Sequence, residues 1–183
     1  PWAPAGAYTV QLTVNGKRYT QPLRLYLDPR VRTPAPALAE LAALTHEMYL
    51  GARAAHQDAV RAHALAAALT TADGEGVAGL RAALDSIAPA PRPEGRRGFR
   101  GRRNGAKAAP TLDAVSGEML GAAMAMQEAD VAPTAENVAA CARARADAAE
   151  VLRKWNALVD GALPRLNARR KAAGLPAVTL PRD

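Results

Sequence analysis

The sequence predicts a mainly α-helical protein: an antiparallel bundle of three to four helices, preceded by an N-terminal β-hairpin from a truncated β-sandwich. Three observations lead to this fold class. Apolar and polar residues alternate strictly over residues 8–14, as in a half-buried strand. From residue 36 onward, the larger apolar residues recur at helical steps of three and four. Alanine supplies 46 of the 183 residues and aromatics only 4%, a composition suited to close-packed helices around a thin core.

The hairpin is expected within residues 1–30. After the alternating stretch comes Asn15-Gly16, the strongest short signal for a hairpin turn, because both positions tolerate positive φ. A two-residue loop pairs Leu12 with Tyr19 and Tyr8 with Leu23, so one face of the ribbon is apolar. Pro22 is expected at an edge or a bulge, because proline has no N–H to donate to a ladder.

An isolated hairpin is marginal in water, and this one begins almost at the first residue. We therefore expect the chain to be a fragment that starts inside the last two strands of a β-sandwich.

The alanine-rich bundle is expected over residues 35–175. Thr111 and Thr134 are the expected N-caps of its last two long helices. Gly161 and Pro164 should kink or break the final helix, and Gly174 should end it. The apolar stripe of that helix is predicted to include Val138, Cys141, Ala148, Leu152 and Trp155. The four helical stretches are expected at about residues 36–70, 77–88, 111–130 and 134–173.

The net charge of +7 is concentrated in one segment, which carries +6 of it between residues 92 and 107. Because this segment is rich in Gly and Pro and poor in large apolar residues, we expect residues 89–110 to form a disordered loop. A solvated linker is the favoured interpretation, and binding of an anionic polymer or nucleic acid is the alternative. The candidate anion-binding residues are Arg92, Arg96, Arg97, Arg100, Arg102, Arg103 and Lys107.

The sequence contains no recognisable catalytic constellation. His56 and His63 share a helix face but are two turns apart, and His46-Glu47 has no second histidine one turn later. Histidines that are solvated or partly packed are therefore favoured over metal ligands.

Other candidate groups also favour structural roles. Cys141 is expected to be a buried and inert thiol. Glu128 and Asp130 are expected to shape a turn, and Trp155 to lie in the core rather than anchor a partner. We predict no catalytic residue, no metal site and no cofactor, and whether the parent protein is an enzyme stays open. No stretch approaches the roughly 20 apolar residues of a membrane span.

Two regions of the chain resemble a known family. Hairpin motifs lie at Trp2–Val10, Leu12–Gly16, Thr20–Leu23 and Asp28–Arg30, and helical motifs at Gln127–Thr134, Trp155–Leu158 and Leu163–Asn167. In this order they resemble the closing Ig-like hairpin and helical tail of large bacterial proteins with sortilin-like, BNR-repeat β-propellers. The resemblance implies the C-terminal region of an exported, glycosidase-like protein, periplasmic or secreted. Any hydrolase residues would lie in the upstream propeller, so none is assigned in this chain.

These observations give three hypotheses for function. The first is a non-catalytic structural or interaction module of a larger exported β-propeller protein. Its partners would be the upstream propeller and the rest of the Ig-like sandwich, with self-association as a further option. The second is binding of an anionic polymer through residues 92–107, although nucleic acid is not the expected partner because no folded nucleic-acid module accompanies the cluster. The third and weakest is an accessory part of a carbohydrate-processing hydrolase.

Overall fold

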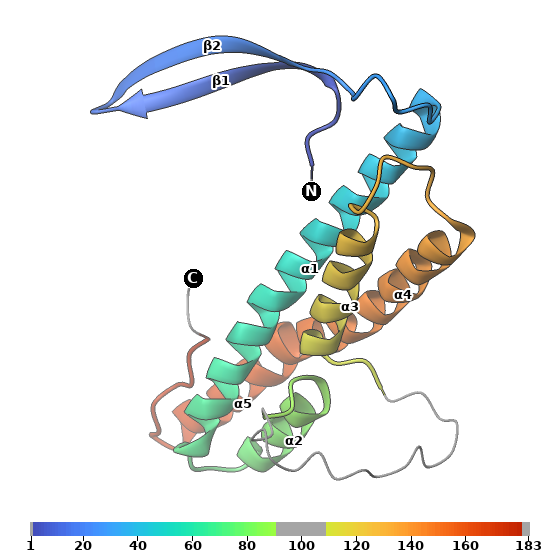
Figure 1. Ribbon diagram of the computed structural model, residues 1–183. Helices are drawn as coiled ribbons and strands as arrows, with labels where there is room; N and C mark the ends of the chain where they lie inside the picture. The colour runs from blue at the N-terminus through green and yellow to red at the C-terminus, as the bar shows by residue number, and fades with distance from the viewer. Residues whose placement is uncertain (1, 91–108, 181–183) are drawn as a thin grey trace, which may run out of the picture.

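The computed structural model describes residues 2–90 and 109–180 of the chain. The described residues form an N-terminal two-stranded hairpin followed by a helical bundle (Figure 1). This confirms the predicted class, a mainly helical protein with an antiparallel hairpin at its N-terminal end. Most of the loop predicted at residues 89–110 lies outside the described residues.

The hairpin consists of β1 (Gly6–Val14) and β2 (Lys17–Leu25), which pair in antiparallel. The turn residues Asn15 and Gly16 both have positive φ, 48° and 77°, as a type I′ turn requires. The predicted register is confirmed, with Leu12 opposite Tyr19 and Tyr8 opposite Leu23. The turn therefore fixes which side chains share a face.

Three long helical segments run alongside one another. Figure 1 shows the third helix running back along the first, the fourth returning in the direction of the first, and the short second helix beside their far end. The elements are α1 (Ala35–Thr70), α2 (Val77–Ile87), α3 (Leu112–Ala125), α4 (Ala135–Ala157), the π-helical segment η1 (Leu158–Ala162) and α5 (Leu163–Ala172).

Both predicted N-caps are present. The Thr111 hydroxyl accepts the Ala114 N–H at 3.2 Å, and the Thr134 hydroxyl accepts the Asn137 N–H at 3.1 Å, so each satisfies a donor that the first helical turn leaves unpaired. The prediction that α3 continues to about Asp130 is wrong. The helix ends at Ala125 because the chain must turn there to begin α4.

The helix does not break at Gly161 and Pro164, although a break is one of the two outcomes predicted there. The chain continues as one helical rod, but it widens into η1 just before the proline. There the Leu163 N–H donates to the Leu158 carbonyl, five residues back. Proline clashes with the carbonyl four residues before it, and a π-helical turn changes the register of these carbonyls without ending the helix.

The core lies where α1, α2, α3 and α4 meet, and alanine is a large part of it. Four alanines of α1, at positions 52, 55, 59 and 62, are almost fully buried. Val138 does not join this core, contrary to the prediction. It is 41% exposed because it lies in the first turn of α4, before the first buried residue of that helix, Cys141. The larger buried side chains are Met48, Leu65, Leu69, Leu84, Ile87, Leu112, Val115, Val151 and Trp155.

The contact between α1 and α3 depends on a glycine. A Cβ built at Gly51 would lie 2.8 Å from the sulfur of buried Met119, well inside van der Waals contact. One turn away, the Ser116 hydroxyl donates to the Ala52 carbonyl at 3.0 Å. Met119 therefore occupies the space that the missing side chain of Gly51 leaves free.

A buried arginine lies at the end of the bundle where α1 ends and α2 begins. Arg170 is only 5% exposed. Its guanidinium donates to the Asp73 carbonyl, between α1 and α2, and to the Pro176 carbonyl at 2.8 Å. Asn167 makes a reciprocal pair of 2.8 Å hydrogen bonds with the backbone of Val178. The residues after α5 are thereby fastened back onto the bundle.

The Gly51–Met119 contact predicts a strong coupling between the two positions. In a Met119→Ala background, Gly51→Ala should raise the free energy of unfolding by about 1 kcal/mol, because the new methyl group meets free space and alanine favours helix. In the wild-type background the same change should give no gain, since overpacking offsets the helix propensity. Urea unfolding of the four proteins measures this coupling.

Gly117→Ala is the matched control, because a Cβ there meets open space on α3. It should stabilise both backgrounds equally, by up to about 1 kcal/mol. Equal effects of Gly51→Ala in the two backgrounds would contradict the packing described here.

Candidate functional site

The histidines do not assemble into a site. His46 and His56 are exposed. His63 lies 2.8 Å from the Asp113 carboxylate through its Nε2 atom, and this contact joins α1 to α3. Among residues 2–90 and 109–180, no group of three or more His, Cys, Asp or Glu side chains is arranged to hold a metal ion. The sequence did not reveal the His63–Asp113 contact because the two residues are fifty positions apart.

The other candidate residues lie either in the buried core or in a turn between helices. Cys141 is buried, as predicted, and burial raises the pKa of its thiol, which disfavours the reactive thiolate. Trp155 is 2% exposed and belongs to the core. Glu128 and Asp130 lie in the turn between α3 and α4. There the Asp130 carbonyl accepts a 2.6 Å hydrogen bond from Thr33, which precedes α1.

The seven predicted anion-binding residues all fall between positions 91 and 108, outside the described part of the chain. The structure therefore does not test them.

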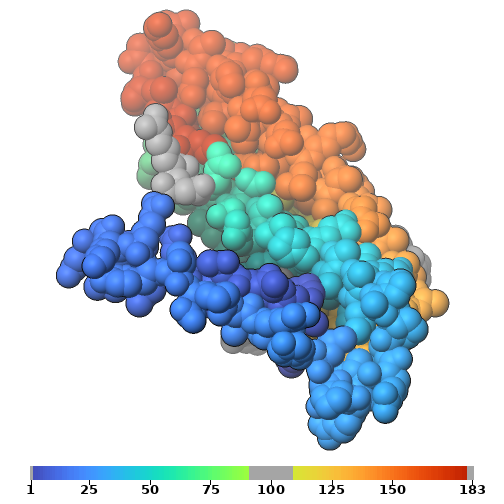
Figure 2. Space-filling model, turned by 90° about the horizontal axis from the view of Figure 1, so that it is seen from above, coloured from blue at the N-terminus to red at the C-terminus, as the bar shows by residue number. Residues whose placement is uncertain are grey.

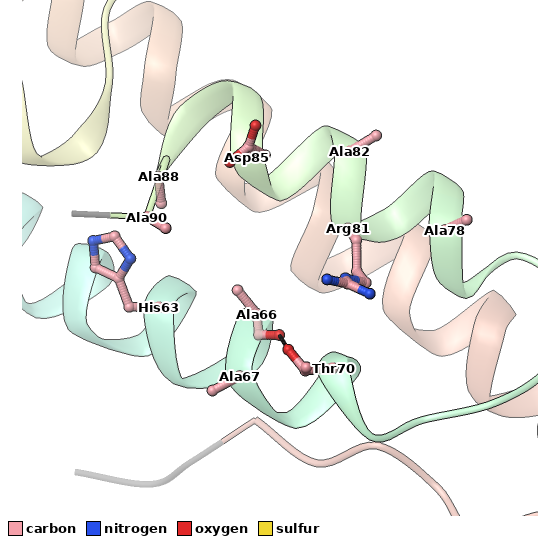
Figure 3. Close-up of a pocket in the computed structure, with 10 residues that line it drawn as sticks. All are labelled: His63, Ala66, Ala67, Thr70, Ala78, Arg81, Ala82, Asp85, Ala88 and Ala90. Carbon is pink, nitrogen blue, oxygen red and sulfur yellow. Dashed lines mark hydrogen bonds between the residues drawn. The ribbon is translucent and has the colours of Figure 1, made fainter. Parts of the chain in front are cut away.

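A groove of about 750 Å³ lies between α1 and α2. Figure 3 shows Arg81 of α2 directed toward α1, with alanines forming most of the surrounding surface. Two of the polar groups that line it are already engaged, because His63 contacts Asp113 and Thr70 donates to the Ala66 carbonyl at 3.1 Å. The other two polar residues of the lining, Arg81 and Asp85, both lie on α2.

The hairpin carries the most distinctive exposed surface. Its apolar face, defined here as Tyr8, Val10, Leu12, Val14, Tyr19 and Leu23, follows from the register, which places these residues on one side of the ribbon. All six are exposed, and Leu12 reaches 59%. Figure 1 shows the hairpin extending away from the helices, and Figure 2 shows it in blue, in front of the bundle, when the molecule is seen from above. An exposed apolar face of this kind is a candidate interaction surface.

The charges of the hairpin are distributed unequally. β1 contains no charged residue, whereas β2 contains Lys17, Arg18 and Arg24. Two of these cations are placed over aromatic rings, Lys17 over Tyr19 and Arg24 over Tyr26, each 5.3 Å from the ring centroid. Lys17, opposite Val14, lies on the same side of the ribbon as the apolar residues, whereas Arg18 and Arg24 lie on the other side.

A bidentate ion pair joins α1 to α4. The Arg145 guanidinium donates to both carboxylate oxygens of Glu47, at 2.7 and 2.9 Å. This bidentate contact lowers the pKa of Glu47 and raises that of Arg145. Because both side chains are about half exposed, the pair contributes modestly to stability.

None of the described helices is long and apolar enough to cross a membrane. No family model, curated protein or solved structure matches the chain. The candidate site is therefore defined by the geometry of this chain, and the apolar face of the hairpin is its principal feature.

The Glu47–Arg145 pair predicts a pH-dependent contribution to stability. At neutral pH, Glu47→Gln should lower the free energy of unfolding by about 0.5 kcal/mol. A carboxylate whose folded-state pKa is lowered stabilises the fold above its unfolded pKa, about 4.3, and loses that contribution as the pH falls through the lowered value. Urea unfolding of both proteins between pH 7 and pH 3 should show the difference shrink to nothing.

The matched control for this prediction is Glu118→Gln on α3, an exposed glutamate for which the described residues show no ion pair. It should change stability by less and without the same pH dependence. A Glu47→Gln effect that persists at pH 3 would mean that the pair does not act through its charge.

Proposed function

We propose that this chain is a non-catalytic structural and interaction module of a larger exported β-propeller protein. In this proposal the hairpin completes an Ig-like β-sandwich and the helical bundle forms a rigid extension beside it. The observation that carries the proposal is the exposed apolar face of the hairpin. Each half-exposed aliphatic side chain of that face would contribute roughly 1 kcal/mol on burial against a second sheet, and an isolated two-stranded ribbon lacks such a cover.

The connection between hairpin and bundle supports this role. After β2, the Asp28 carboxylate accepts bonds from the backbone and side chain of Arg30, which forms a local turn. Thr33 then ties the segment before α1 to the Asp130 carbonyl. These contacts hold the link between the two parts in a defined conformation, so the bundle would follow the sheet onto which the hairpin docks.

The first test places a lysine on either face of the hairpin, in the protein expressed from its complete open reading frame. Tyr19→Lys charges the apolar face, and Thr20→Lys charges the opposite face of the same strand. We expect trypsin to cleave the Tyr19→Lys hairpin much faster, because a buried charge prevents docking, while Thr20→Lys behaves as wild type. Both variants add one trypsin site, so they differ only in the face that is charged.

Far-ultraviolet circular dichroism should be the same for both variants, because the hairpin contributes nothing to the buried core of the bundle. Equal cleavage of the two variants would refute docking through the apolar face. A reading frame that encodes nothing before Pro1 would refute the proposal that this chain belongs to a larger protein.

A second candidate function is binding of an anionic polymer, favoured by the +6 charge between residues 92 and 107. It predicts that the chain binds a fluorescent single-stranded oligonucleotide with an affinity that falls steeply with salt, with a logarithmic slope of roughly −5 if all seven cations contact phosphates. Deletion of residues 91–109 should abolish this binding. The control, Arg143→Gln with Arg153→Gln on the exposed surface of α4, should leave it intact, and binding that survives the deletion would exclude this function.

A third candidate, an accessory role in a carbohydrate-processing hydrolase, rests on the family resemblance alone.

A further inference from the structure

The two edges of the hairpin are chemically different. In a type I′ hairpin, the residues that flank the turn, here Val14 and Lys17, form a hydrogen-bonded pair, and such pairs alternate along an antiparallel ladder. The register therefore makes Gln11–Thr20 and Thr9–Pro22 non-hydrogen-bonded pairs. At these positions the backbone groups point away from the partner strand, toward the free edges.

The free edge of β2 is protected against further pairing. Pro22 occupies one of its outward positions, so that position has no N–H to donate. Arg18 and Arg24 occupy two more, and charged residues and proline are the usual means by which proteins block an exposed edge.

The free edge of β1 has no such protection. Its outward positions are Ala7, Thr9, Gln11 and Thr13, all uncharged and none a proline. These residues are exposed, and no third strand of the described residues joins the sheet. The edge of β1 is therefore a complete row of unpaired backbone donors and acceptors, which is a template for strand addition.

We propose that a second copy of this chain pairs with β1 through this edge, so that two hairpins form one four-stranded antiparallel sheet with a two-fold axis at Val10. In this register Thr9 faces Gln11 of the second copy, and Ala7 faces its Thr13. All four outward residues of each β1 strand are then paired. An isologous contact of this kind closes at two copies.

The side chains and charges fit this register. On the apolar face, Val10 would meet Val10 of the second copy and Tyr8 would meet its Leu12, pairings that stabilise antiparallel strands. The cationic strands β2 would lie at the two outer edges, separated by both β1 strands. Pairing through β2 in the equivalent register would instead place Arg18 opposite Arg24 of the second copy and leave Thr20 facing Pro22.

This inference goes beyond the proposed function because it uses the edge of the hairpin, whereas the proposed function uses its apolar face. The four-stranded sheet would still present one continuous apolar face for docking.

A matched pair of proline variants tests the edge. Gln11 and Thr20 lie directly opposite each other, and both direct their N–H outward, so a proline at either position removes no bond within the hairpin. We expect sedimentation equilibrium of the chain to show a dimer for the wild type and for Thr20→Pro. Gln11→Pro should weaken the dimer by about tenfold or more, because the symmetric sheet loses two bonds.

A pair of cysteine variants tests the register without relying on proline. In a Cys141→Ala background, Val10→Cys should form a disulfide-linked dimer under mild oxidation, because non-hydrogen-bonded pairs bring Cα atoms to about 4.5 Å. Gln21→Cys, directly opposite Val10 on the same face, should not.

A monomeric wild type, equal cross-linking of the two cysteines, or loss of the dimer in Thr20→Pro alone would overturn the proposal. None of these results bears on the contrast between Tyr19→Lys and Thr20→Lys, so the proposed function can fail or stand separately.

Discussion

The close approach of α1 to its neighbours is the constraint on which the rest of the bundle depends. Four of the eight buried residues of α1 are alanine, and at Gly51, where Met119 of α3 lies against the helix, even the methyl group is missing. Small side chains bring helix axes together, but they bury little apolar area each, so the few large residues carry most of the hydrophobic stabilisation. Trp155 and Leu65 are examples, because both are almost completely buried.

Polar contacts at different positions along α1 link it to the neighbouring helices. Arg145 and Glu47 join α4 to α1 near one end, while His63 and Asp113 join α1 to α3 farther along. At the far end Arg170 is buried, and its charge is compensated by backbone carbonyls. Half-exposed pairs add little energy, whereas removal of a buried charged group leaves its partners unsatisfied, so the end held by Arg170 should be the most sensitive to substitution.

The hairpin differs from the bundle, because its apolar face is exposed although its turn and register are well defined. Its apolar side chains contribute nothing to the core of the bundle, and the proposed docking rests on this exposure. The two strands of the hairpin differ chemically, because proline and all three cations lie on β2. The face supports the proposed docking onto a second sheet, and the neutral edge of β1 supports pairing with a further strand.

The sequence by itself determined the local features: the hairpin register from Asn15-Gly16, the N-caps Thr111 and Thr134, and the apolar spacing of the helices. Each of these depends on residues close together in the chain, so local sterics and hydrogen bonding suffice to specify it. Tertiary structure decided that Val138 stays exposed and that His63 meets Asp113. These outcomes depend on where distant helices end and cross, which is set by side-chain packing over the whole bundle rather than by any local pattern.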